Sequence, residues 1–138
     1  MTGCVFCDIV AGRTSADLVV YRSDGVIAFI AKDPDAFGHT VLAPTAHYAD
    51  LLDAPPSVVG DLMAVVQRVA RHYRDVAGAE GFNVLHASGL PAQQSVAHLH
   101  VHLVPRFPSD GLNAWPDLGG SNDTAVEMAS RLRAPTAV

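Results

Sequence analysis

Three of the chain's seven histidines stand within five residues, in the segment SVAHLHVHLVPR at positions 95–106. Imidazoles occupy every second position, and aliphatic residues fill the positions between them. Such strict alternation predicts a half-buried β-strand whose successive side chains point to opposite faces of a sheet. One face then carries Leu99, Val101 and Leu103, and the other carries His98, His100 and His102. Neighbouring imidazoles lie about 6.5–7 Å apart in a strand, which lets them contact one extended anionic group such as a phosphate chain.

The alternative interpretation of this segment is a solvated strand face that happens to be rich in histidine. Thr, Lys or Glu would suit a plain hydrated face better than imidazole. The pattern therefore favours a buried aliphatic face and an imidazole face that forms the floor of a polar site.

The rest of the chain predicts a small sheet and one long helix. Strands are expected at 18–22 and 26–31 around the turn Ser23-Asp24-Gly25, then at 39–44 and 82–86, with the histidine strand as the fifth. A helix is expected over 58–76, after Pro55 and Pro56 and before Gly78. Its apolar stripe consists of Val58, Leu62, Val65, Val66, Val69, Tyr73 and Val76. Short helices are expected at 4–11 and 124–133, which together indicate an α+β fold with an antiparallel sheet of about five strands.

Length and charge limit the class of protein. The 138 residues are enough for a single domain, with a core at about 4–107 and a tail at 108–138. The formal net charge is −5 and the charged fraction is 17%, which argues against a general nucleic-acid binder or a membrane-surface protein. No apolar run approaches the length of a membrane span and no secretory signal is evident, so a cytoplasmic location is expected.

The two cysteines, Cys4 and Cys7, both lie near the N-terminus. In a reducing compartment this spacing indicates metal ligands or redox thiols rather than a structural disulfide. Cys-x-x-Cys is half of a zinc site, and since no second cysteine pair exists, histidines must complete it. A redox dithiol and two idle thiols are the alternatives; a thioredoxin-like motif would follow a strand, and no strand precedes this one.

Four motifs together resemble bacterial proteins of the histidine triad (HIT) superfamily, Hint-like members with an N-terminal Cys-x-x-Cys. They are CVFCDIVAG at the start, GHTVLAPTAH in the middle, QSVAHLHVHLVPR late in the chain and, within the last, the triad HLHVHLV. The resemblance runs from about residue 4 to about residue 107. It implies a homodimer whose two sheets join edge to edge, and a site for a purine nucleotide or nucleotide conjugate.

The same resemblance implies chemistry at the α-phosphate of nucleoside phosphoramidates, monophosphate esters or dinucleoside polyphosphates. His100 is then the nucleophile that forms a covalent nucleotidyl-histidine intermediate, because neutral imidazole is a competent nucleophile near neutral pH. By analogy His102 and Ser95 donate to phosphoryl oxygens or assist the leaving group. Gln94 and Ser95 match the family's Gln-Ser, whose alternative interpretation is an ordinary polar loop, and N–H groups of the loop 93–96 would add oxyanion stabilisation.

The nucleoside would rest in an apolar slot for which Val5, Phe6, Ile9 and Phe29 are candidates; core packing is an equally good interpretation of these four. Three positions depart from the family pattern. Many members carry an Asp that binds ribose hydroxyls where this chain has Ala31, an Asn where it has Ala87, and a Gly where it has Gln93. Loss of that carboxylate removes a charge-assisted hydrogen bond worth roughly 1.5–3 kcal/mol.

Resemblance to zinc-containing members of the family makes His47 and His98 the partners of Cys4 and Cys7. A closed Cys₂His₂ set implies structural zinc. His39 is then interpreted as a structural residue that bonds near the dimer interface or the adjacent strand, and His86 receives no role. Two rival functions remain at this point: a metal-dependent hydrolase that uses the triad as ligands, and a non-catalytic nucleotide-binding module.

Overall fold

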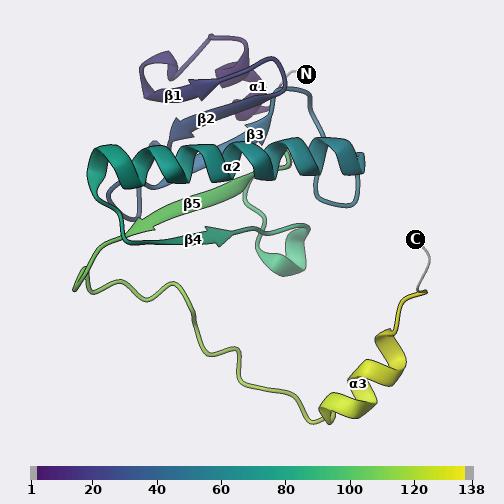
Figure 1. Ribbon diagram of the computed structural model, residues 1–138. Helices are drawn as coiled ribbons and strands as arrows, with labels where there is room; N and C mark the ends of the chain where they lie inside the picture. Colours follow the sequence, from purple (N-terminus) through teal and green to yellow (C-terminus); the bar gives the residue numbers. More distant parts are fainter. Residues whose placement is uncertain (1–2, 136–138) are drawn as a thin grey trace.

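The computed structural model describes residues 3–135 and contains one five-stranded antiparallel sheet. The strands are β1 (Val19–Arg22), β2 (Val26–Ile30), β3 (Thr40–Pro44), β4 (Gly81–Leu85) and β5 (Val101–Arg106), in the spatial order β1-β2-β3-β5-β4. The long helix α2 (Pro56–Ala77) lies across one face of this sheet (Figure 1). The predicted α+β class, strand number and covering helix are thus confirmed.

The β1–β2 hairpin forms where Asp24-Gly25 predicts a turn. The backbone N–H of Ser23 donates to the carbonyl of Val26, which closes the loop. β2 then pairs with β3 in regular register from Val26↔Pro44 to Ile30↔Thr40. β2 and β3 are buried almost throughout because elements cover both faces of the sheet at this point.

α2 packs its apolar stripe on the aliphatic side of β5. Pro55 and Pro56 start the helix as predicted, and Gly78 ends it in a left-handed conformation with φ of 73°. Leu62, Val65, Val66 and Val69 share one core cluster with Leu99, Val101 and Leu103. Val76, predicted to belong to the buried stripe, is 65% exposed, because the last turn of α2 extends beyond the residues that cover it.

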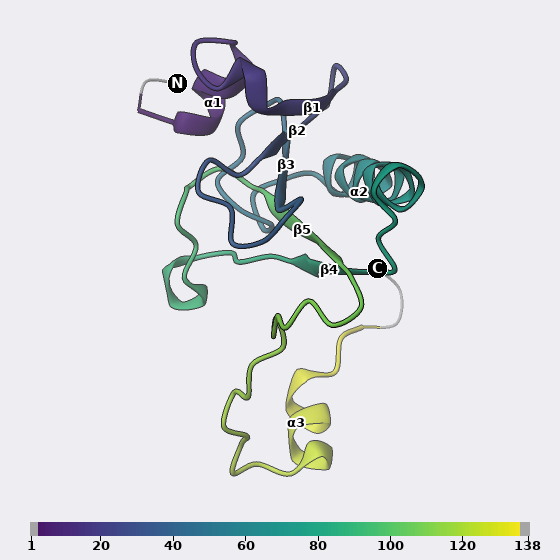
Figure 2. The same cartoon turned by 90° about the vertical axis from the view of Figure 1, so that its left-hand side faces the viewer.

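The opposite face of the sheet is covered at one end by the short helix α1 (Val5–Val10) (Figure 2). Phe6 and Ile9 of α1 pack in a second cluster with Ile27, Phe29 and Val41. This corrects the expectation of an open imidazole face, since His98 and His100 are buried and only His102 is half-exposed.

Regular pairing of β5 begins at Val101, whereas the predicted strand already included His98 and Leu99. The alternation of faces nevertheless extends upstream, because Leu99 belongs to the α2 core while His98 and His100 lie on the other side. The backbone N–H of Leu99 donates to the carbonyl of Tyr48 at 2.7 Å, in the loop that follows β3. The segment 98–100 therefore leaves the sheet and pairs with a loop, although its side chains keep the strand pattern.

After β5 the chain leaves the sheet as an extended segment and ends in α3 (Ala125–Leu132), close to the predicted helix. Thr124 and Glu127 form a capping box at its start. Two short 3₁₀ turns, Ala16–Leu18 and Leu90–Ala92, complete the described elements. Within residues 3–135 no helix has both the length and the apolar character needed to cross a bilayer.

Candidate active site and metal centre

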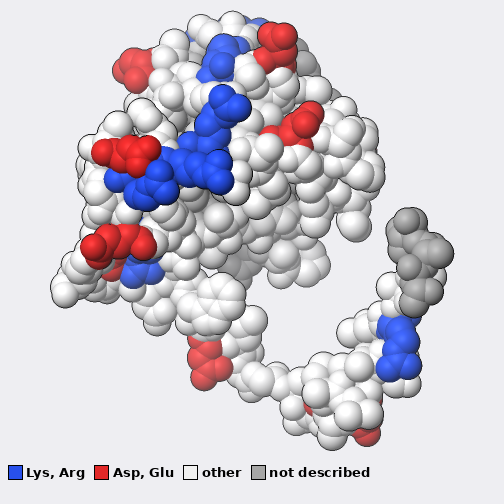
Figure 3. All heavy atoms as spheres, in the orientation of Figure 1, with Lys and Arg blue, Asp and Glu red and all other residues white. Residues whose placement is uncertain are grey.

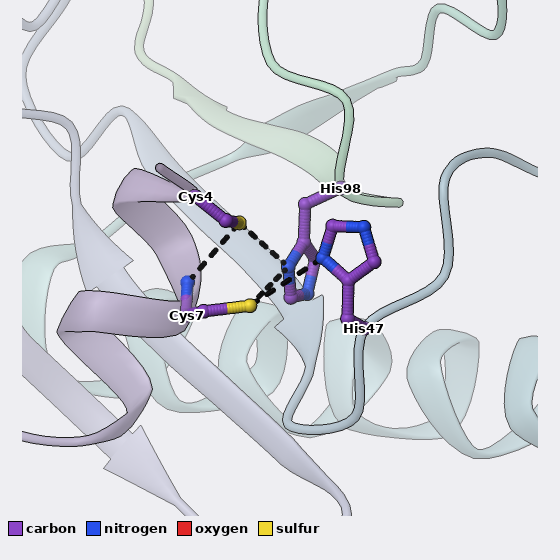
Figure 4. Close-up of side chains that lie close together, drawn as sticks. All are labelled: Cys4, Cys7, His47 and His98. Carbon is purple, nitrogen blue, oxygen red and sulfur yellow. Dashed lines mark hydrogen bonds between the residues drawn. The ribbon is translucent and has the colours of Figure 1, made fainter. Parts of the chain in front are cut away.

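Cys4, Cys7, His47 and His98 form one cluster, as the sequence predicts (Figure 4). Nδ1 of His98 lies 3.4 Å from Sγ of Cys4 and 3.6 Å from Sγ of Cys7, and Nδ1 of His47 lies 3.4 Å from Sγ of Cys7. Tetrahedral zinc with ordinary Zn–S and Zn–N bonds requires sulfur and nitrogen ligands about 3.5 Å apart. The donor set and its spacing therefore fit zinc.

Neighbouring hydrogen bonds prepare two of these ligands for a metal. The ring Nε2 of His98 lies 2.9 Å from the carbonyl oxygen of Pro44, which can only accept, so Nε2 carries the proton and Nδ1 keeps its lone pair. The backbone N–H of Cys7 donates to Sγ of Cys4 at 3.4 Å, which fixes the position of that sulfur. Four protein ligands close the site, which is typical of structural rather than catalytic zinc.

His100 lies beside the metal cluster with its nitrogen atoms in defined states. Its Nδ1 lies 2.7 Å from the carbonyl oxygen of His98, so Nδ1 carries the proton and Nε2 is unprotonated in the neutral ring. The ring of Phe6 meets the imidazole edge-to-face with centroids 4.9 Å apart. Burial lowers the pKa of His100, so the ring is neutral near pH 7.

His102 and His39 form a chain of hydrogen bonds whose direction is fixed by the backbone. The N–H of Asp35 donates to Nδ1 of His39 at 3.1 Å, so Nε2 of His39 carries the proton and donates to Nδ1 of His102 at 2.9 Å. Nε2 of His102 is then protonated and remains free to donate. The expectation that His39 bonds to the adjacent strand is confirmed.

Burial, followed by the neighbouring imidazoles of His100 and His39, lowers the pKa of His102 to about 4. Burial also lowers the pKa of His39, against the opposing effect of the Asp35 carboxylate. Both rings are therefore neutral at pH 7, and His102 presents an N–H donor rather than a positive charge.

His86, which received no role from the sequence, supports the backbone of the nucleophile candidate. Its Nδ1 donates to the carbonyl of His100 at 2.7 Å, and its Nε2 pairs with the hydroxyl of Ser88. Strand pairing brings His86 to this position. β4 and β5 are antiparallel with Leu85 opposite His102, so residue 86 lies beside the triad. That register is not visible in the sequence.

The loop before the triad is held by Gln94. Its side-chain amide donates to the carbonyls of Ala49 and Val96 and accepts from the N–H of Gly89. Gln93 takes a left-handed conformation with φ of 67°, at the position where the family often has Gly. Ser95 is exposed and lines a cavity of about 410 Å³ with Cys4, His47 and Val96. The direct contact of Gln94 and Ser95 with a nucleotide stays a prediction.

A second cavity of about 410 Å³ adjoins His102 on the imidazole face of the sheet. His39 and Asp35 line one side, and Arg106 and the segment 112–114 line another. Arg106 holds that segment in place, because its guanidinium contacts both carboxylate oxygens of Asp110 at 2.8 Å and the carbonyl of Leu112 at 2.6 Å. Of the triad, only His102 lines this cavity.

The HIT domain family model matches residues 13–109 of the chain. The protein belongs to the histidine triad family. A HIT-like protein of Mycobacterium tuberculosis is 36% identical over 129 residues, covering 94% of this chain and 89% of the relative. Adenylylsulfatase HINT3 of Arabidopsis thaliana is 33% identical, with 94% of this chain and 65% of the relative covered. Adenosine 5'-monophosphoramidase HNT1 of Candida albicans is 27% identical, with coverages of 94% and 89%.

Solved structures support the same assignment. SMU.412c from Streptococcus mutans superposes with a TM-score of 0.80 at 30% identity, covering 96% of this chain and 82% of the other. A Zn-bound histidine triad family protein from Mycobacterium smegmatis superposes with a TM-score of 0.77 at 38% identity and covers 84% of each chain. The zinc-bound relative and the Cys₂His₂ cluster together support structural zinc in this HIT protein.

Of the residues expected to hold the nucleoside in this HIT chain, Val5, Phe6 and Ile9 belong to α1 and Phe29 belongs to β2. Phe6, Ile9 and Phe29 are 8%, 5% and 3% exposed, while Val5 is half-exposed and lines the cavity of Ser95. Phe6 and Phe29 meet edge-to-face at 5.3 Å, which satisfies the core-packing interpretation. Their role as a base slot stays a prediction, as does the effect of Ala31 and Ala87 on ribose recognition.

Proposed function

We propose that this HIT protein is a nucleotidyl hydrolase or transferase that acts at the α-phosphate of nucleotide conjugates through a covalent intermediate on His100. The carrying observation is the hydrogen bond from Nδ1 of His100 to the carbonyl of His98, which leaves the Nε2 lone pair free. Two enzyme-named relatives, an adenylylsulfatase and an adenosine 5'-monophosphoramidase, support a substrate that contains a purine nucleotide. The substrate class is thus phosphoramidates, monophosphate esters or dinucleoside polyphosphates.

The chemistry proceeds in two displacements at phosphorus. The Nε2 lone pair of His100 forms a bond to the α-phosphorus while the bond from phosphorus to the leaving group breaks. From a phosphoramidate or ester the leaving group takes a proton from solvent and departs as an amine or alcohol. From a dinucleoside polyphosphate it departs as a nucleoside phosphate anion. Water, or another acceptor, then attacks phosphorus and loses its proton as the Nε2–P bond breaks, which regenerates neutral His100.

The neighbouring groups bind the phosphoryl oxygens. His102 donates its Nε2–H, and the hydroxyl of Ser95 donates from the preceding loop. The N–H groups of Ser95 and Val96 add further donors, whereas those of Gln93 and Gln94 already donate to the carbonyls of Leu90 and Gly89. His39 acts on the reaction only through His102, since it fixes the tautomer of that ring. His86 supports the His100 peptide, so both are positioning residues.

The metal-ligand rival requires a second histidine cluster with an open coordination position. Within residues 3–135 the one group of side chains arranged for a metal is the Cys₂His₂ set, and it contains neither His100 nor His102. Zinc at that set ties α1 to the loop after β3 and to the approach of β5. This arrangement favours a nucleophilic His100 and a structural metal.

A trapping experiment tests the proposal. The protein is mixed with a nucleoside phosphoramidate, quenched in base to preserve the phosphoramidate adduct, and examined by intact-protein mass spectrometry. We expect a mass increase of one nucleotidyl group in the wild type and none in His100→Ala, with equal zinc content in both. Persistent absence of the adduct, with nucleotide binding retained, would establish the non-catalytic binding module instead.

A further inference from the structure

The candidate nucleophile His100 has α1 on one side and His102 on another. Its ring centroid lies 4.9 Å from that of Phe6 in α1 and 5.0 Å from that of His102. The cavity of about 410 Å³ that is lined by His102 and Asp35 shares no lining residue with the cavity of Ser95, and we call it the His102 cavity. A nucleotide conjugate extends from its α-phosphorus in two directions, towards the nucleoside and towards the leaving group. Because the nucleoside is expected beside α1, the leaving group extends into the His102 cavity.

The walls of the His102 cavity are largely apolar. Leu85 and Val104 line it from the sheet, and Leu112 lines it from the segment after β5. Its volume of about 410 Å³ is within the range of pockets that hold small organic ligands. Such walls suit the carbon chain or ring of a leaving group better than a chain of phosphates, which needs polar contacts along its length.

Among the described residues, Arg106 is the one permanent cation that lines the His102 cavity, and its charge is already paired. The guanidinium donates to both carboxylate oxygens of Asp110 at 2.8 Å, and further to Asn83 and to the carbonyl of Leu112. Lys and Arg gather instead over α2, on the face of the sheet opposite to the imidazoles (Figure 3). An anionic leaving group therefore meets no free cation among the described residues of this wall.

Asp35 contributes the charge that is left in the wall. Its backbone N–H holds Nδ1 of His39 at 3.1 Å, and its carboxylate oxygen Oδ2 lies 3.9 Å from the same atom. Because His39 is neutral at pH 7, this contact leaves the negative charge of Asp35 uncompensated. Burial lowers the pKa of His102, and the carboxylate of Asp35 opposes that effect, so its charge acts on the cavity as far as the triad.

We propose that Asp35 is a specificity-determining residue that selects the leaving group by its charge, an inference that rests on the proposed function. Its carboxylate favours a leaving group whose carbon chain ends in an ammonium group. It disfavours an anionic leaving group, such as the nucleoside phosphate released from a dinucleoside polyphosphate, because no free cation compensates the repulsion. The side chain of Asp35 is 94% exposed, so the selection is moderate in size and is weakened by salt.

A matched series of substrates tests the selection. Adenosine 5'-phosphoramidates are prepared with a butyl chain on nitrogen that ends in an ammonium, a hydroxyl or a carboxylate group. In each, the P–N bond breaks and the amine nitrogen takes a proton from solvent, so only the remote charge differs. We expect the ratio of kcat/KM for the cationic to the anionic substrate to fall about tenfold in Asp35→Asn, and the preference to reverse in Asp35→Lys. Added salt should lower the same ratio in the wild type.

Asp33→Asn is the matched control. Asp33 is exposed in the same turn between β2 and β3 but does not line the His102 cavity, so this variant loses the same charge and should keep the wild-type ratio. A ratio that is unchanged in Asp35→Asn, or that falls equally in Asp33→Asn, overturns the selection by Asp35 while turnover itself upholds the proposed function. A wild type that turns over none of the substrates overturns the proposed function and this inference with it.

Discussion

At the scale of single residues, backbone carbonyls assign the protonation of the histidines. Carbonyls of His98 and Pro44 fix the rings of His100 and His98, and the N–H of Asp35 fixes His39 and, through it, His102. Each carbonyl can only accept and each N–H can only donate, so the tautomers follow. The segment from His98 to His102 thereby presents a metal ligand, an unprotonated nitrogen and an N–H donor at every second position.

His100→Ala should reduce turnover of a nucleoside phosphoramidate by at least about 10³-fold, because no other group replaces the nucleophile. Nucleotide affinity, measured by calorimetry, should change little since the donors of His102 and the loop remain. Metal content serves as the control for folding. A variant with wild-type kcat would remove His100 from the mechanism.

The lowered pKa of the half-exposed His102 predicts a dependence of stability on pH. Its pKa is about 4 in the folded chain and near 6.5 when unfolded, so the unfolded state binds more protons between these values. The stabilisation is therefore complete above pH 6.5 and is lost as the pH falls towards 4. We expect a loss of about 1–2 kcal/mol across this window, after solvent screening of the half-exposed ring.

The measurement is urea unfolding of the wild type and His102→Asn from pH 7.5 to pH 4. The difference in unfolding free energy between the two proteins isolates this ring from zinc release and from the other histidines. A difference that stays constant with pH would show that His102 has an ordinary pKa in the folded chain.

At the scale of elements, zinc joins segments that the sheet leaves apart. α1 supplies Cys4 and Cys7, the loop after β3 supplies His47, and the approach to β5 supplies His98 (Figure 4). Since α1 also places Phe6 against His100, the metal indirectly orders the candidate nucleophile. The metal cluster and the histidine triad share His98. In the proposed function the cluster holds structural zinc, and His100 and His102 act on the phosphate.

Cys4→Ser should therefore destabilise the fold more than it slows the chemistry. We expect loss of bound zinc and a Tm lower by about 10 °C or more, because structural zinc contributes directly to folding free energy. The rate per folded molecule should fall much less. Metal analysis and calorimetry check the first statement, and an unchanged Tm would show that the cluster holds no structural metal.

The turn between β2 and β3 supplies a second test, at Gly38. This residue has φ of +77°, and an added Cβ would lie 2.5 Å from Cγ of Pro105 in β5. Both the left-handed backbone and the contact disfavour a side chain, so Gly38→Ala should cost about 2–4 kcal/mol. Gly25→Ala is the control, since nothing lies within 4 Å of a Cβ there. Equal urea midpoints for the two variants would contradict the assigned turn geometry.

At the scale of the whole molecule, β4 leaves one edge of the sheet open for pairing. The homodimer expected from the sequence would join two β4 strands there. Light scattering should give twice the chain mass of 14.5 kDa. Val84→Lys, at a 43% exposed position of β4, should shift the equilibrium towards monomer, whereas Leu52→Lys should not. A wild-type protein that is monomeric in light scattering would show that β4 does not join two chains.

Much of the fold was predictable because it depends on local periodicity. The alternation around His100, the turn at Asp24-Gly25, and the stripe that ends at Gly78 each specify an element from neighbouring residues alone. The zinc ligands were predictable for a different reason, since Cys-x-x-Cys has a recognisable spacing and the family resemblance supplied the distant histidines. The nucleotide contacts of Ser95, Gln94 and the α1 residues remain predictions.

Residue types and their alternation along the chain thus determined which side chains share a face and that Cys4 and Cys7 form half of a metal site, and the family resemblance of the sequence indicated the other two ligands. Only the tertiary structure decided how each imidazole is protonated, that α1 covers His98 and His100, and that His86 and His39 support the triad. These properties arise from contacts between segments far apart in the sequence, such as His39 with His102, which are 63 residues apart, and Phe6 with His100, which are more distant still. Strand register and loop placement set such contacts, and neither has a local signature in the sequence.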